Sequence, residues 1–127
     1  MLRYPSFYPR SGGGTTMNND NSKLYTSTLH SILKMNPFDH VVILSLHDND
    51  FYVEMINEKM KELNNNWDEQ LKDGASLFGM ENWGLLKKAI HNMEGYVYLV
   101  GNERFQLKTS IQTFALRDKI FYIVIIR

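Results

Sequence analysis

The chain has 127 residues, 43% of them hydrophobic, and its 14 basic side chains balance 14 acidic ones. It contains no cysteine, which excludes disulfides, thiolate zinc sites and a cysteine nucleophile, and its zero formal charge argues against a general nucleic-acid binder held by phosphate contacts. No apolar run approaches the ~20 residues of a membrane-spanning helix. No phosphate loop, dinucleotide fingerprint or zinc pattern occurs, so we predict a cytoplasmic protein without a cofactor.

Residues 1–20 are predicted to be a flexible N-terminal arm outside the folded domain. Three consecutive glycines and an Asn/Asp cluster form a connector. Before it, Tyr4-Pro5 recurs as Tyr8-Pro9 between two arginines; proline keeps such a segment extended, and its aromatic rings offer contact area. Two interpretations stay open: a non-native leader with Met17 as the true start, or a docking arm for a partner. The docking interpretation assigns partner binding to Arg3, Tyr4, Phe7, Tyr8 and Arg10.

The rest of the chain, residues 21–127, is predicted to form one domain that begins with a helix and a buried strand. The helix is indicated by apolar residues that share one helical face: Tyr25, Leu29, Ile32 and Leu33. It is expected to end at Asn36-Pro37, because the residue before a proline is pushed out of the α region. Residues 41–46 are apolar on both faces, which is typical of an interior strand.

A long helix is predicted to follow, because apolar residues recur at spacings of three and four from Val53 through Ile56, Met60 and Leu63 to Trp67. Gly74 is placed to end it. Three acidic residues recur every four positions, so they are expected to form an acidic ridge along this helix. The ridge is a second candidate surface for binding a partner, and it consists of Glu54, Glu58 and Glu62.

The remaining elements are predicted to be a short helix from Asn82 to Gly95 and three strands, at residues 96–100, 104–113 and 119–126. In the middle strand Phe105, Leu107, Thr109, Ile111 and Thr113 alternate with polar residues, so one face is expected to be buried. The fold class that follows is α+β: a two-layer sandwich whose mostly antiparallel sheet, a three-strand meander plus strand 41–46, is covered by three or four helices on one face.

The polar stretch His47-Asp48-Asn49-Asp50 allows two interpretations. Two carboxylates two residues apart could reach one hard cation, with His47 as a further ligand or a general base. The simpler interpretation is that Asp48 and Asp50 begin the following helix, where side-chain oxygens accept the first backbone N–H groups and carboxylates suit the helix dipole. We favour the helix-capping interpretation.

A further candidate is a nucleic-acid-binding surface on the polar face of residues 104–113. Its basic residues would be Arg104, Lys108, Arg117 and Lys119. Single strands bind sheet faces where aromatic rings stack bases among such cations. Because Phe105 is assigned to the opposite face, we do not favour this surface.

The function predicted from these features is that of a small, non-enzymatic protein that binds another protein, as an accessory, inhibitor or immunity protein does. Residues 48–81 hold nine acidic and three basic side chains, whereas residues 104–127 hold five basic and one acidic. The alternative is a divalent-metal-dependent hydrolase or nuclease centred on His47, Asp48 and Asp50. Apolar strands without charged gatekeepers leave a homodimer open, and the asparagine-rich composition would suit a phage or viral accessory protein.

Overall fold

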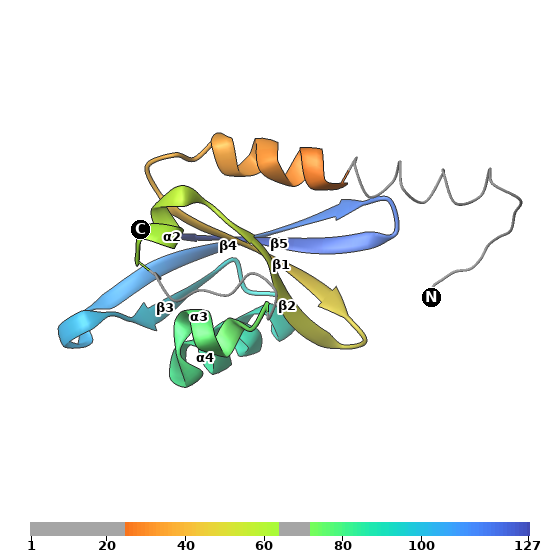
Figure 1. The fold of residues 1–127 in the computed structure, drawn as a ribbon. Helices are drawn as coiled ribbons and strands as arrows, with labels where there is room; N and C mark the ends of the chain where they lie inside the picture. The colour runs from red at the N-terminus through yellow and green to blue at the C-terminus, as the bar shows by residue number, and fades with distance from the viewer. Residues whose placement is uncertain (1–24, 64–71) are drawn as a thin grey trace, which may run out of the picture. The chain divides into compact units, whose positions relative to one another are not determined.

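The computed structural model describes residues 25–63 and 72–127 (Figure 1). The predicted arm at 1–20, with its five candidate partner-binding residues, lies outside the described residues. The chain divides into two units, Met1–Ile32 and Leu33–Arg127. Residues 25–34 are helical and the helix ends before Pro37, as predicted.

The second unit contains a five-stranded antiparallel sheet with the strand order β2-β1-β5-β4-β3. Its strands are β1 (His40–His47), β2 (Asp50–Ile56), β3 (Tyr96–Val100), β4 (Gln106–Leu116) and β5 (Lys119–Ile126). The C-terminal meander and the central position of its last strand are confirmed, since β5 pairs with β1 on one side and β4 on the other. The α+β class with an antiparallel sheet is therefore confirmed, whereas the placing of every helix on one face stays a prediction.

The predicted long helix is wrong in its first half, because residues 50–56 form β2. A β-bulge explains the error. Val53 pairs with Leu44 and Met55 pairs with Ile43, so Glu54 is an extra residue in β2. An extra residue shifts the side-chain alternation by one, and Val53 and Ile56 therefore both point into the core although they are three positions apart. A spacing of three is also that of apolar residues on one face of a helix, so the sequence pattern alone predicts a helix here.

The described helices that lie wholly within the second unit have between 5 and 12 residues. They are α2 (Glu58–Leu63), α3 (Gly74–Phe78) and α4 (Met80–His91), with a 3₁₀ turn at η1 (Asn102–Arg104). Gly74 begins a helix instead of ending one. The side chain of Asp73 caps α3 by accepting from the Ala75 N–H at 3.1 Å, and a Cβ at position 74 would overlap the Trp83 ring. Within residues 25–63 and 72–127, no helix is both long and apolar enough to cross a membrane.

The core lies between one face of the sheet and helices α3 and α4, which Figure 1 shows against that face. Its buried residues include Val42, Leu44, Phe51, Val53, Val124, Trp83, Leu86, Ala89 and Ile90. Thr109 and Ile111 are buried on β4 as predicted. Phe105 is instead 66% exposed; it precedes the first pair of the β3–β4 ladder, so strand alternation does not govern it.

Candidate functional site

The polar stretch after β1 forms the turn of a hairpin, so the helix-capping interpretation is wrong. His47 pairs with Asp50 across the β1–β2 ladder, and the two residues between them have φ angles of 50° at Asp48 and 66° at Asn49. Positive φ at both central positions is what a type I′ turn requires, and Asp and Asn adopt it more readily than most residues. The turn geometry therefore explains why Asp48 and Asn49 occupy these two positions.

This turn allows a direct stability test. Replacing Asn49 with glycine is expected to raise the free energy of unfolding by about 0.5–1 kcal/mol, since glycine has no Cβ to strain at φ 66°. Valine at the same position should lower it by about 1–2 kcal/mol. Chemical denaturation of the two variants checks both signs, and equal stabilities would contradict the turn assignment.

The hairpin does not gather the ligands of a metal site. Across residues 25–63 and 72–127, no group of three or more His, Asp or Glu side chains is placed to hold one ion. The ring of His47 instead packs edge-on against Tyr52, with 6.1 Å between the ring centroids. The Asp50 carboxylate accepts the Phe51 N–H at 2.9 Å. We therefore propose no metal chemistry at His47, Asp48 and Asp50.

The three glutamates of the predicted acidic ridge do not share one helix. Glu54 lies on β2, where its carboxylate accepts the Ser45 hydroxyl at 2.9 Å and lies 3.7 Å from the Lys72 ammonium. Glu58 and Glu62 lie on α2, and Glu58 pairs with Lys61 at 3.4 Å. The strand between residues 50 and 56 removes the common helical face on which the ridge depended.

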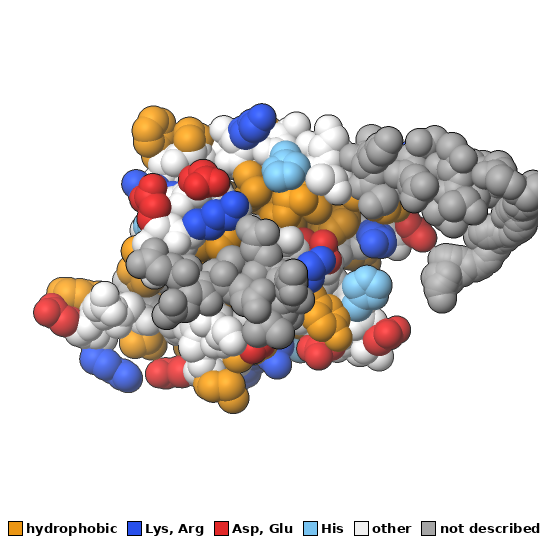
Figure 2. Space-filling view, in the orientation of Figure 1, with side chains coloured by type: hydrophobic (Ala, Val, Ile, Leu, Met, Phe, Trp, Pro, Cys, Tyr) orange, Lys and Arg blue, Asp and Glu red, His pale blue; other side chains and the backbone are white. Residues whose placement is uncertain are grey.

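The four basic residues of the predicted nucleic-acid surface are spread along the β4–β5 hairpin. Arg104 precedes β4 and lies 3.9 Å from Glu81, whereas Arg117 lies in the turn at the other end and Lys119 begins β5. The eleven residues of β4 span roughly 35 Å between these groups. Figure 2 also shows acidic and basic side chains interspersed on the face in view. Only Lys108 has exposed aromatic neighbours on its own face of the sheet.

Those neighbours are the two tyrosines of β3, which are not among the candidate residues predicted from the sequence. Tyr96 and Tyr98 are 53% and 47% exposed, and their rings meet edge-to-face with centroids 5.7 Å apart. Tyr98 pairs with Lys108 across the ladder, and the Lys108 ammonium lies 5.2 Å from the centre of the Tyr96 ring. The alternation in Tyr-Val-Tyr-Leu-Val carried this signal, because it places both rings on one face of a strand.

The backbone of the same two tyrosines lies on an open edge of the sheet. β3 is the last strand of the sheet and pairs only with β4. The Ile111 N–H donates to the Gly95 carbonyl at 2.8 Å, and antiparallel alternation then turns the N–H and C=O groups of Tyr96 and Tyr98 away from β4. Within the described part of the chain, these outward groups have no hydrogen-bond partner.

The side chain of Asn82 occupies the backbone groups of Val100, the next outward-facing residue of this edge. Its side-chain amide donates to the Val100 carbonyl and accepts the Val100 N–H, both at 2.8 Å. The amide thus binds the strand as a neighbouring peptide group would. On the opposite edge, the Val53 N–H of β2 donates to the Lys72 carbonyl at 3.1 Å. The open segment of the β3 edge therefore comprises Tyr96 and Tyr98.

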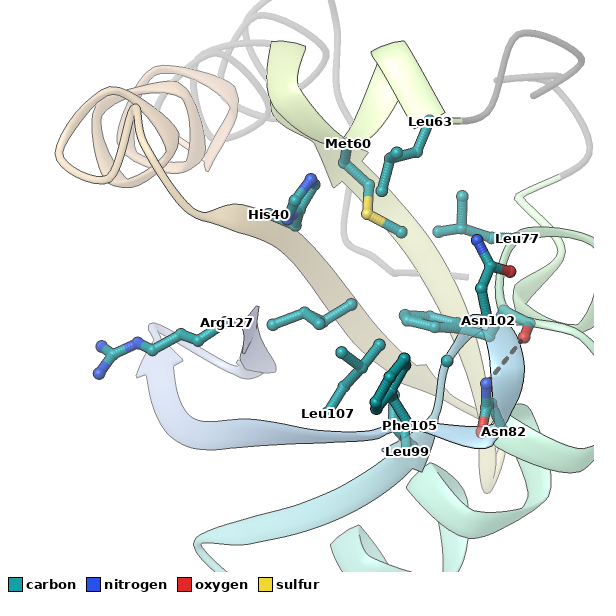
Figure 3. A pocket seen from close by; sticks show the side chains of 13 residues that line it. His40, Met60, Leu63, Leu77, Asn82, Leu99, Asn102, Phe105, Leu107 and Arg127 are labelled. Carbon is teal, nitrogen blue, oxygen red and sulfur yellow. Dashed lines mark hydrogen bonds between the residues drawn. The ribbon is translucent and has the colours of Figure 1, made fainter.

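A pocket of about 540 Å³ lies near the far end of β3 (Figure 3). Its walls are mostly apolar, with Met60, Leu77, Leu99 and Leu107 among them. Ligand sites usually add a few convergent polar groups. Here the Asn82 amide is already bonded to Val100, and Figure 3 shows Asn82 and Asn102 on one side of the pocket and His40 and Arg127 on the other. The β3 edge is the better candidate site.

Comparison with protein-family models and with curated proteins finds no match, so the function has to be inferred from the residues themselves.

Proposed function

We propose that this chain is a small, non-enzymatic protein-binding module that takes up an extended segment of its partner as an added strand at β3. The observation that carries the proposal is the open edge at Tyr96 and Tyr98, where unpaired backbone groups and exposed aromatic rings occur at the same residues. In strand addition, main-chain hydrogen bonds supply affinity and alternate side chains supply specificity. A cytoplasmic location fits the cysteine-free sequence.

The size of the open segment sets the expected strength of binding. Two outward residues offer two N–H and two C=O groups, and four hydrogen bonds contribute about 2–6 kcal/mol in total. Alone, these correspond to a dissociation constant of tens of micromolar at best. The tyrosine rings then supply the remaining affinity, because aromatic contacts on a strand bury large area at low entropic cost.

The ring geometry favours a protein over a nucleic acid. Bases stack on free aromatic faces, but the Lys108 ammonium already lies over the Tyr96 ring and the Tyr98 ring meets Tyr96 at its edge. With no net charge on the chain, phosphate contacts would add little. A strand partner instead leaves the Lys108 contact in place and uses the backbone.

Photo-crosslinking tests this proposal directly. With p-benzoylphenylalanine at position 98 of the full chain, irradiation in cells of the source organism is expected to give covalent protein adducts. Position 52 is the matched control, because Tyr52 is 39% exposed but lies on β2, whose edge is covered at Val53. Adduct yield at position 98 should exceed that at position 52 several-fold, and equal yields would refute the proposal. Mass spectrometry identifies the adducts.

A further inference from the structure

We infer that the strand added at β3 is β3 of a second copy of the chain, antiparallel to the first, with a two-fold axis at Val97. This inference rests on the proposed function and names the partner of the same site. The pairing would join the two five-stranded sheets edge to edge.

The hydrogen-bonding groups fix this register. With the axis at Val97, Tyr96 of each copy faces Tyr98 of the other. The four outward groups on each strand then form four hydrogen bonds and none is left over. A register that places Tyr98 against itself forms only two, because Tyr96 would meet Val100, whose groups are already bound to Asn82.

The side chains favour the same pairing. β3 carries no charged residue, so two copies bring no like charges onto the line where they meet. Tyr96 would lie directly across from Tyr98 of the second copy, which forms an aromatic cross-strand pair at each end of the short interface. The nearest cation, Lys108, lies one strand further in and is held over the ring of its own Tyr96.

Because only two residues of β3 are open, a longer strand from another protein gains no further hydrogen bonds there. Any strand that continued past Tyr98 would find the Val100 groups occupied by Asn82. In a second copy, β3 likewise has open groups only at Tyr96 and Tyr98, and it carries no charged residue. Among extended segments, a second copy is therefore complementary to the edge in length, hydrogen-bonding groups and charge.

Sedimentation velocity and amide hydrogen exchange on the full chain test the inference. The chain is expected to pass from monomer to dimer as its concentration rises. Over the same range, the Tyr96 and Tyr98 amides should become at least tenfold slower to exchange. The Val97 and Leu99 amides bond to β4 and should be slow at every concentration. A wild-type chain that stays monomeric to 1 mM, or dimerises without slowing the two tyrosine amides, would overturn the inference.

A pair of double variants tests the register. Tyr96→Lys with Tyr98→Glu removes the ring contacts but places each lysine against a glutamate of the other copy, so its dimer should be at least tenfold tighter than that of Tyr96→Lys with Tyr98→Lys. Tyr96→Lys with Tyr98→Lys opposes like charges and should weaken the wild-type dimer at least 100-fold. If Tyr98 faced itself instead, the Lys/Glu variant would also be monomeric, which would overturn the register. Thermal melts confirm that both variants are folded.

The crosslinking experiment separates the two proposals. A monomeric wild type that still forms adducts with another protein at position 98 overturns self-pairing and leaves the proposed function standing. Absence of adducts at position 98, together with a monomeric chain, overturns both.

Discussion

Replacing Asn57 with alanine is expected to lower the free energy of unfolding by about 3–5 kcal/mol. The Asn57 side chain joins three segments around the start of α2. Its oxygen accepts the N–H groups of Val41 and Met60 at 3.2 and 3.0 Å, and its nitrogen donates to the carbonyls of Asp39 and Asn36 at 2.7 and 3.3 Å. Because Val41 and Met60 are buried, alanine would remove the side-chain oxygen that their N–H groups bond to away from water.

Urea denaturation measures this loss, and Asn102→Ala is the matched control. Asn102 is exposed, so its replacement should change the free energy of unfolding by less than about 0.5 kcal/mol. A loss below 1 kcal/mol at position 57 would show that solvent replaces the asparagine, and that the junction between β1 and α2 does not depend on this side chain.

The strands of the meander could be predicted because their signal is local. Alternation along 104–113 indicates a strand with one buried face, and the uninterrupted apolar run at 119–126 indicates a strand buried on both faces. β2 could not be predicted in the same way, since the extra residue Glu54 breaks the period within seven residues. A bulge depends on how β1 pairs with β2, and that information is absent from either strand taken alone.

The candidate site also combines a feature that is local in the sequence with features that depend on the fold. The placing of Tyr96 and Tyr98 on one face of a strand can be deduced from the sequence alone. Whether that strand lies at an edge depends on the order of five strands. The limit at Val100 depends on Asn82, which is 18 positions earlier in the chain and lies on α4. Sequence spacing identified the helix of Asn82 but gave no reason to connect it with β3.

Asn82 is therefore expected to control how far the edge can pair, and Asn82→Ala should tighten self-association by about 5- to 150-fold. The alanine variant frees the N–H and C=O of Val100. Two copies could then pair with Tyr98 at the axis and form six hydrogen bonds in place of four, a gain of about 1–3 kcal/mol. Sedimentation velocity against concentration measures the change, together with exchange of the Val100 amide.

Two further variants separate edge release from general damage to α4. Asn92→Ala alters an exposed asparagine at the C-terminal end of the same helix, and it should leave the dissociation constant unchanged. Asn82→Asp can still accept the Val100 N–H but cannot donate to its carbonyl, so its association should lie between those of the wild type and the alanine variant. If Asn82→Ala associates no more tightly than Asn92→Ala, the Val100 position does not limit pairing. The edge would then be restricted by something other than the amide of Asn82.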